Sequence, residues 1–147
     1  MQEYQLRRAI VEEAESWIGT PYHANAMVKG GGVDCLRLPL GVAINVGLFD
    51  HDDGIKIKYS PQQSMHHPEE LCIQYLVSCG MREISENNIK PGDIVLYKVF
   101  KAHAHGAIVV DWPSRVIHCV QQLGVIYSHG TQEGFLVRRP RRYFTKF

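Results

Sequence analysis

The change in hydrophobic period near residue 90 is the feature that most constrains this chain. Before it, apolar residues recur at helical spacing; after it come five short runs rich in β-branched and aromatic side chains. The runs are residues 93–99, 105–110, 115–121, 124–129 and 134–140, separated by turn signals such as KPGD, DWPS and QLG. Connections this short favour antiparallel pairing, because a parallel crossover needs about a dozen residues or more. Helices first and a five-stranded antiparallel sheet second indicate an α+β fold.

Three segments ahead of the sheet show helical spacing of apolar residues, and a glycine follows each: residues 3–18, 35–46 and 69–79. Asp34 is the expected N-cap of the second helix. The stretch between the first two helices is rich in Gly and Pro, so we expect a long loop there. Residues 48–67 are expected to form an irregular excursion, with a short extended piece at 55–58.

The size and charge of the chain fit a single domain spanning residues 1–147. The chain has 147 residues, of which 45% are hydrophobic and 21% charged, and a formal net charge of +1. These values are typical of a soluble globular protein and point to no nucleic-acid or membrane partner. The final RRPRRYFTKF carries four arginines, but the apolar residues around them fit an exposed edge strand and its continuation better than a nucleic-acid tail.

The first residues carry charges throughout and contain no apolar core of signal-peptide length. No later run reaches the roughly 18 apolar residues of a membrane span. We therefore expect a protein made in the cytoplasm without a signal peptide. The four cysteines, at positions 35, 72, 79 and 119, show no CxxC spacing, so free thiols are expected.

Cys35 is the residue best placed for covalent chemistry. It follows GGGVD at the start of the second helix, where unpaired N–H groups and the positive end of the helix dipole favour a thiolate. The same N–H groups can stabilise the oxyanion of a tetrahedral intermediate, and the glycines leave room for a substrate backbone. The alternative is a small buried cysteine after a flexible loop.

A catalytic thiol also needs a histidine to accept its proton and a polar group to hold that imidazole. Alternation places His105 and His118 on corresponding faces of two successive strands, with Cys119 on the opposite face. Only DWPS joins these strands, so a hairpin would make the two histidines cross-strand neighbours. The helix that carries Cys35, packed on that face, would complete a Cys-His-His set. Alternatively, His118 is an ordinary strand histidine.

A metal site is a weaker alternative built from the same residues, because HAH and the later HC supply imidazole and thiolate ligands. His118 and Cys119 are adjacent on a strand and point to opposite faces, so they cannot easily bind one ion. No carboxylate-rich segment accompanies them. We therefore expect no metal.

Taken together, GTPY, GVDC, PGDIVLY, HGAIVV and VIHC resemble the NlpC-type cell-wall peptidases, papain-like cysteine hydrolases of bacteria and phages. The matching order, residue types and spacing extend from about residue 5 to residue 130. The stretch GTPYHANAMVKGGGVDC, and YSP in the 48–67 connection, further resemble the branch encoded beside phage and prophage tail genes. The resemblance implies a papain-like fold with N-terminal helices packed on the sheet.

The resemblance implies that Cys35 is the nucleophile, His105 the general base and His118 the group that orients the base. Tyr22 of GTPY matches a tyrosine whose hydroxyl reaches the active site and assists the oxyanion hole. The family hydrolyses amide bonds in peptidoglycan stem peptides, typically between D-glutamate and a diamino acid, through an acyl-enzyme and without a cofactor. His103 ranks second to His105, either as a substrate-side residue or as a residue without a role at the site.

Three features depart from the family pattern. Arg37 stands where a glycine usually lies two positions after the nucleophile. It could bind a substrate carboxylate, hold the thiolate electrostatically or block access, and the neighbouring Asp34 is a further candidate for substrate binding. Pro39 lacks an N–H that the second helix would use, so that helix is expected to begin later or to kink. His105 and His118 are 13 residues apart, one more than the family pattern, which a wider DWPS turn would absorb.

The leading hypothesis is a peptidoglycan endopeptidase of a phage or prophage tail, with stem peptides as substrate and tail proteins as partners. One alternative is a catalytically impaired tail module that keeps the papain-like fold for assembly or wall binding. Another is a cysteine amidase or acyltransferase that acts on a different substrate.

Overall fold

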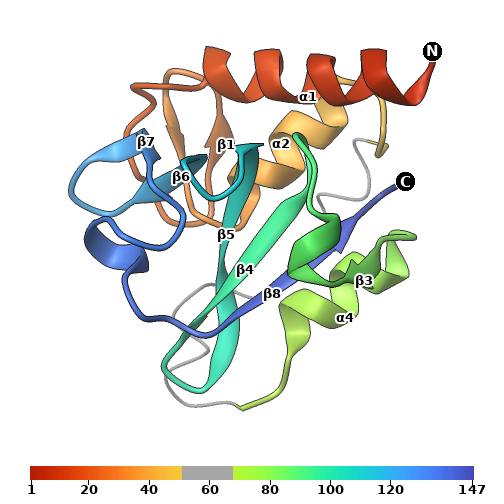
Figure 1. Cartoon of the computed structure of the whole chain (residues 1–147). Coiled ribbons are helices and arrows are strands. Elements are labelled where there is room, and N and C mark those ends of the chain that lie inside the picture. The colour runs from red at the N-terminus through yellow and green to blue at the C-terminus, as the bar shows by residue number, and fades with distance from the viewer. Residues whose placement is uncertain (51–67) are drawn as a thin grey trace.

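Helices cluster on a central sheet in the computed structural model, which describes residues 1–50 and 68–147 (Figure 1). The helices are α1 (Glu3–Ser16), α2 (Arg37–Asn45) and α4 (Leu71–Ser78), with the short 3-10 helices η2 (Glu86–Asn88) and η3 (Gly134–Leu136). The strands are β1 (Met27–Val28), β2 (Gly32–Val33), β3 (Arg82–Ile84), β4 (Ile94–Val99), β5 (Ala102–Asp111), β6 (Arg115–Val120), β7 (Gly124–Ser128) and β8 (Arg141–Thr145). Among the described residues, no helix combines the length and the apolar character that a membrane crossing needs. The extended piece expected at 55–58, with most of the excursion around it, lies outside the described residues.

The main sheet has six strands in the order β3-β8-β4-β5-β6-β7, and every neighbouring pair is antiparallel. A separate two-stranded sheet pairs β1 with β2 inside the expected loop. The α+β class is therefore confirmed, whereas the expectation of five strands is wrong. The additional strands β1, β2 and β3 are only two or three residues long, too short to produce a detectable alternation.

The C-terminal strand begins later than the sequence pattern predicts. Instead of a strand over residues 134–140, the chain forms η3 and then β8. Pro140 cannot donate a backbone hydrogen bond, so β8 starts just after it, and the Pro140 carbonyl accepts the N–H of Lys98 at 2.8 Å. β8 lies between β3 and β4, so the exposed edge expected for RRPRRYFTKF is also wrong.

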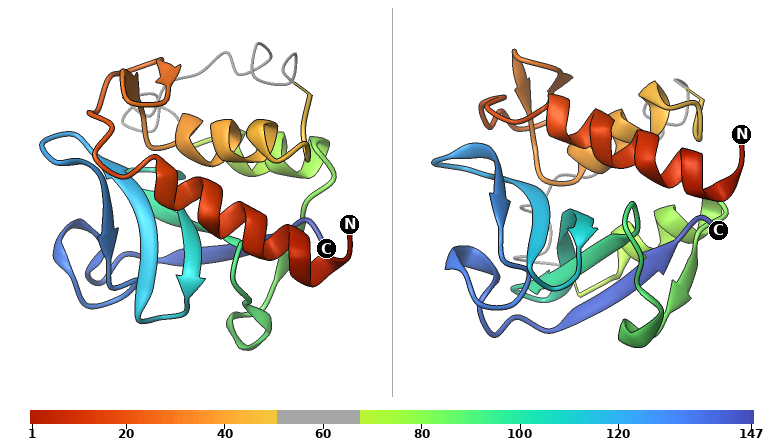
Figure 2. Two further views of the ribbon diagram at one scale, coloured as in Figure 1. Left: turned by 90° about the horizontal axis from the view of Figure 1, so that it is seen from above. Right: turned by 45° about the horizontal axis from the view of Figure 1, so that its top comes forward.

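Different parts of the chain cover the two faces of the main sheet, and α1 and α2 lie together on one of them (Figure 2). The core on that face includes Trp17, Leu38, Ile108, Ile117 and Phe144. On the other face a second cluster packs against Leu136 of η3; its strand residues are Val95, Tyr97, Ala107, Val109 and Val116. Strand alternation assigns His105 and His118 to this second face.

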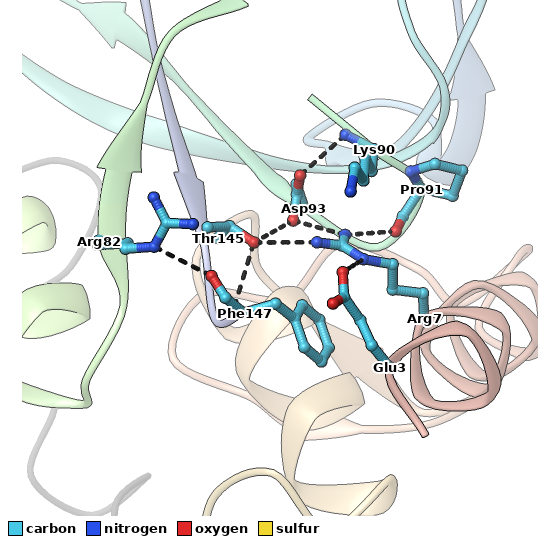
Figure 3. Close-up of polar contacts among 8 residues, drawn as sticks. All are labelled: Glu3, Arg7, Arg82, Lys90, Pro91, Asp93, Thr145 and Phe147. Atoms are coloured by element: carbon cyan, nitrogen blue, oxygen red, sulfur yellow. Dashed lines mark hydrogen bonds and ion pairs between the residues drawn. The ribbon is translucent and has the colours of Figure 1, made fainter. Parts of the chain in front are cut away.

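A buried ion pair fixes α1 to the sheet (Figure 3). Arg7 Nη1 lies 2.8 Å from Asp93 Oδ1, and Arg7 Nε lies 2.8 Å from Glu3. Asp93 also accepts the Thr145 hydroxyl at 2.6 Å and the Lys90 N–H at 2.9 Å. Asp93 is 2% exposed and Arg7 9%, so a charge pair that water barely reaches is satisfied by surrounding donors.

α2 begins at Arg37 rather than at Cys35, and Pro39 explains the difference. The Leu38 N–H bonds to the Asp34 carbonyl at 3.0 Å, as in a helix. The next bond, from residue 39 to the Cys35 carbonyl, cannot form because proline has no N–H. Of the two outcomes expected from Pro39, the later start is therefore the one observed, and Cys35 lies in the turn just ahead of the helix.

Candidate active site

Asp34 fixes the turn that carries Cys35. Its Oδ1 accepts the backbone N–H groups of Leu36 at 3.2 Å and Arg37 at 2.9 Å, which satisfies two donors at the start of the helix. Its Oδ2 accepts the N–H of Asn25 at 2.8 Å, from the loop before β1. The buried carboxylate thus joins the loop and the helix on either side of Cys35.

Arg37 is turned toward this carboxylate. Its Nη1 lies 2.7 Å from Asp34 Oδ2, and its side chain is 11% exposed while that of Asp34 is fully buried. The pairing supplies a counter-charge that the buried Asp34 needs. Cys35 and His105 line a common cleft, and neither Arg37 nor Asp34 is among the described residues of its wall. Contact of Arg37 or Asp34 with substrate therefore stays a prediction.

His105 and His118 come from β5 and β6, the hairpin expected from the sequence. The register pairs His118 with Ala107, so the two histidines are diagonal neighbours rather than directly opposite. An irregularity between Val109 and Asp111 absorbs the additional residue of the 13-residue spacing within β5, in place of the wider turn expected. The hairpin thus keeps both histidines on one face.

The two imidazoles form a hydrogen-bonded line that ends at a serine. His105 Nε2 lies 2.9 Å from His118 Nδ1, and the rings are nearly perpendicular at 87°. His118 Nε2 lies 2.7 Å from the Ser128 hydroxyl at the end of β7. His105 is 4% exposed and His118 1%, so water does not compete for these bonds.

This line of contacts selects one set of tautomers for base catalysis. If His105 is to take a proton on Nδ1, its Nε2–H must donate to His118 Nδ1. His118 then carries its proton on Nε2 and donates it to the Ser128 oxygen. Within residues 1–50 and 68–147, His105 Nδ1 is therefore the one nitrogen of the two rings for which no hydrogen bond is seen.

The Cys35 thiol contacts the N-terminal part of β5 from the helix-covered side of the sheet. Its Sγ donates to the carbonyl of Ala104 at 3.7 Å, next to His105 in the chain. A Cβ on Gly106 would lie 3.2 Å from the Cys35 carbonyl oxygen, so a glycine at this position allows the close approach. The expectation that the helix packs on the face of His105 is therefore wrong, because α2 packs on the opposite face.

Cys35 and His105 nevertheless line the same cleft, which has a volume of about 510 Å³. Aromatic, amide and small apolar groups form most of its wall; the described lining residues are Tyr22, Cys35, Val99, Phe100, Ala104, His105, Cys119, Val120, Gln121, Gln122, Phe135 and Arg139. A cleft of this size is within the usual range for small-molecule and peptide ligands.

Comparisons with known proteins give a structural match only. No family model matches the chain, and no curated protein matches it either. Seventeen chains of solved structures do match. One is the crystal structure of the NlpC/p60 domain of the peptidoglycan hydrolase SagA, with a TM-score of 0.61 and 22% identity over 92% of this chain and 96% of that one. This chain has the NlpC/p60 fold.

Tyr22 lies within this NlpC/p60 fold at the cleft, next to β2. Burial raises its pKa to about 12, with smaller contributions from Cys35 and Asp34, and a hydrogen bond with Gln121 opposes the shift. The hydroxyl therefore stays protonated at neutral pH and can donate a hydrogen bond to a negatively charged oxygen.

Burial keeps the thiol and the imidazoles uncharged in this cleft. It raises the pKa of Cys35 well above its usual value, and the Asp34 charge adds to this shift. It lowers the pKa of His105 well below its usual value, helped by His118 and Arg139, and lowers the pKa of His118 to about 4. These shifts favour a neutral thiol and neutral imidazoles, so a thiolate at Cys35 would form only by loss of a proton to a base.

His103 is held away from the described cleft wall by Glu70. Its Nδ1 lies 2.9 Å from Glu70 Oε1, and its backbone N–H donates to Oε2 at 2.8 Å. The contact ties the start of β5 to the residue just before α4. The predicted role of His103 on the substrate side stays a prediction.

Sequence reasoning missed three residues at the site: Ser128, Phe135 and Arg139. Ser128 lay within an expected strand, and its place near His118 follows from the β6–β7 register, which alternation alone does not fix. The Phe135 ring lies 4.7 Å from that of His105, and Arg139 stacks on it at 4.1 Å. No local sequence pattern predicts that these two residues lie at the cleft. Phe135 belongs to η3 and Arg139 follows it, in a segment that was expected to form a strand.

Proposed function

We propose that this protein is a cysteine peptidase that hydrolyses an amide bond in peptidoglycan stem peptides. The observation that carries the proposal is the line from His105 through His118 to Ser128. It leaves Nδ1 of His105 without a hydrogen bond to any described residue, in a cleft that a thiol also lines. The NlpC/p60 fold supports the substrate class, since the similar solved domain belongs to a peptidoglycan hydrolase.

The chemistry follows from the protonation states. His105 Nδ1 takes the proton of Cys35, and the thiolate attacks the amide carbonyl to form a carbon–sulfur bond. The Tyr22 hydroxyl donates to the oxyanion of the tetrahedral intermediate. The His105 imidazolium then gives its proton to the leaving amine as the carbon–nitrogen bond breaks. Water, deprotonated by His105, hydrolyses the resulting thioester and regenerates the thiol.

The test is release of stem-peptide fragments from purified peptidoglycan, followed by mass spectrometry. The wild-type chain is expected to release fragments with a new amino terminus, and Cys35→Ala to release none. Cys79→Ala removes a thiol that lies outside the described cleft wall and serves as the matched control. Equal release by wild type and Cys35→Ala would refute the proposal.

A second candidate is a catalytically impaired module that keeps the fold for assembly or wall binding. The observation favouring it is the burial of the thiol, which is 5% exposed and has a raised pKa. Such a module predicts that Cys35 reacts with a small thiol probe at pH 7 no faster than the partly exposed Cys79. The peptidase predicts that Cys35 reacts faster than Cys79, because His105 accepts the thiol proton, and that a peptide bound in the cleft protects Cys35 from the probe.

We further propose that the protein is made in the cytoplasm, is carried on a phage or prophage tail and acts at the cell wall. This proposal rests on the resemblance of GTPYHANAMVKGGGVDC to the tail-associated branch. Mass spectrometry of purified virions should detect the chain, and a tail protein should be recovered with it. Virions that lack the chain would refute this location without affecting the proposed chemistry.

A further inference from the structure

Arg139 is held in one position on the wall of the cleft. Its Nε donates to the carbonyl of Phe135 at 2.6 Å, and its Nη1 donates to the carbonyl of Lys98 at 3.3 Å. The centre of its guanidinium lies 4.1 Å from the centre of the Phe135 ring. All three contacts are with neutral groups, so they orient the guanidinium, and no carboxylate of the described residues pairs with its charge.

The lack of a carboxylate partner distinguishes Arg139 from three other arginines of the chain. Arg7, Arg37 and Arg142 each form an ion pair with a carboxylate. Across residues 1–50 and 68–147, Arg139 has no such partner, and the described cleft wall contains no Asp or Glu. Arg139 is also the sole Lys or Arg of that described wall. The cleft is therefore electropositive at this point, which favours an anionic ligand.

Phe135 connects this cation to the candidate base. The same ring that carries Arg139 lies 4.7 Å from the ring of His105, so an anion bound at Arg139 would lie close to the reacting amide. The charge of Arg139 opposes formation of the His105 imidazolium and contributes to the lowered pKa of that residue. A bound anion would offset this effect during proton transfer.

We propose that Arg139 binds a carboxylate of the substrate beside the amide bond that Cys35 attacks. A guanidinium matches a carboxylate in shape as well as in charge, and charge-assisted hydrogen bonds of this kind are about twice as strong as neutral ones. The inference rests on the proposed function and extends it: the substrate is an anionic peptide, and the chain discriminates against the same peptide when that carboxylate is amidated.

Two synthetic γ-D-glutamyl peptides test the inference. They are identical except that the glutamyl α-carboxylate is free in one and a carboxamide in the other. The wild-type chain is expected to cleave the free acid about tenfold faster or more in kcat/KM. In Arg139→Gln this preference is expected to fall to about twofold or less, through loss of activity on the acid and not on the amide. Arg138→Gln, which removes a charge from the neighbouring exposed position, should keep the preference.

Binding provides a readout that does not depend on cleavage. Calorimetry with Cys35→Ala should show tighter binding of the acid than of the amide, and the double variant with Arg139→Gln should bind both equally. If Arg139→Gln keeps the wild-type preference, or if Cys35→Ala binds both peptides equally or neither, the carboxylate site is refuted. If the wild type fails to cleave peptides and peptidoglycan while Cys35→Ala still prefers the acid, the proposed function fails and the binding site stands.

Discussion

The Arg7–Asp93 network and the His105–His118–Ser128 line are both buried polar clusters, but they differ in how they end. Asp93 accepts bonds from Arg7, a hydroxyl and a backbone N–H, so its carboxylate is closed on all sides. The histidine line is closed at His118 and opens to the cleft at His105. The first cluster contains a permanent ion pair between Arg7 and Asp93. The second contains neutral imidazoles, which become charged only when they accept a proton.

The largest effect is expected from breaking the closed network. Arg7→Met leaves the Asp93 carboxylate, 2% exposed, without its counter-ion, and this is expected to cost about 3–5 kcal/mol of unfolding free energy. Urea unfolding measures it. Arg8→Met, at an exposed position paired with Glu12, should cost less than about 1 kcal/mol. Similar losses in the two variants would mean that the network contributes no more than a surface pair.

The pH dependence of stability should distinguish the open line from the closed network. Burial lowers the pKa of His118 from 6.5 to about 4 and shifts that of His105 in the same direction. Unfolded histidines bind protons near pH 6.5 and the folded ones do not, so this stability is complete above about pH 6.5 and is lost as the pH falls toward about 4. For His118 the loss is about 3 kcal/mol.

Urea unfolding at pH 7, 6 and 5 measures this slope, and the interval lies above the pH range in which carboxylates titrate. His118→Asn should have a shallower slope than wild type, because it lacks one of the two groups. An identical slope in wild type and variant would show that His118 is protonated in the folded state as readily as in the unfolded one.

His118→Leu is expected to lower kcat by roughly 100-fold, because His105 loses the acceptor that fixes its tautomer. KM should change little, since His118 is not part of the described cleft wall. His118→Asn keeps a polar group and should recover part of the lost rate. If the leucine and asparagine variants have equal rates, orientation of His105 through this hydrogen bond does not contribute to catalysis.

Ser128→Ala should have the smallest effect, about a tenfold loss in kcat, because Ser128 acts on His105 only through His118. Ser128→Thr restores a hydroxyl and is expected to recover most of the rate. The loss should also be smaller in a His118→Asn background, since the two changes interrupt the same line. Additive losses in the double variant would show that Ser128 does not act on His105 through His118.

Local chemistry determined much of this fold from the sequence. Helical spacing located the three helices of the described residues, and alternation with short turns located four of the strands. The hairpin of His105 and His118 followed from four turn residues, because so short a connection allows only one pairing direction. The prediction of Asp34 as N-cap was wrong in position, since Leu36 is the N-cap of the later helix, but the Asp34 carboxylate does accept N–H groups at its start. These outcomes depend on neighbours in sequence, which the sequence displays directly.

The tertiary structure decided how distant segments meet. It placed β8 inside the sheet, packed the Cys35 helix on the face opposite His105, and turned Arg37 toward Asp34. It also brought Ser128, Phe135 and Arg139 to the site. Strand order and packing face are set by the total apolar area buried and by satisfaction of all backbone donors, which are properties of the whole chain. The sequence by itself thus determined which residues are candidates for the chemistry, and the tertiary structure decided which of them face the cleft.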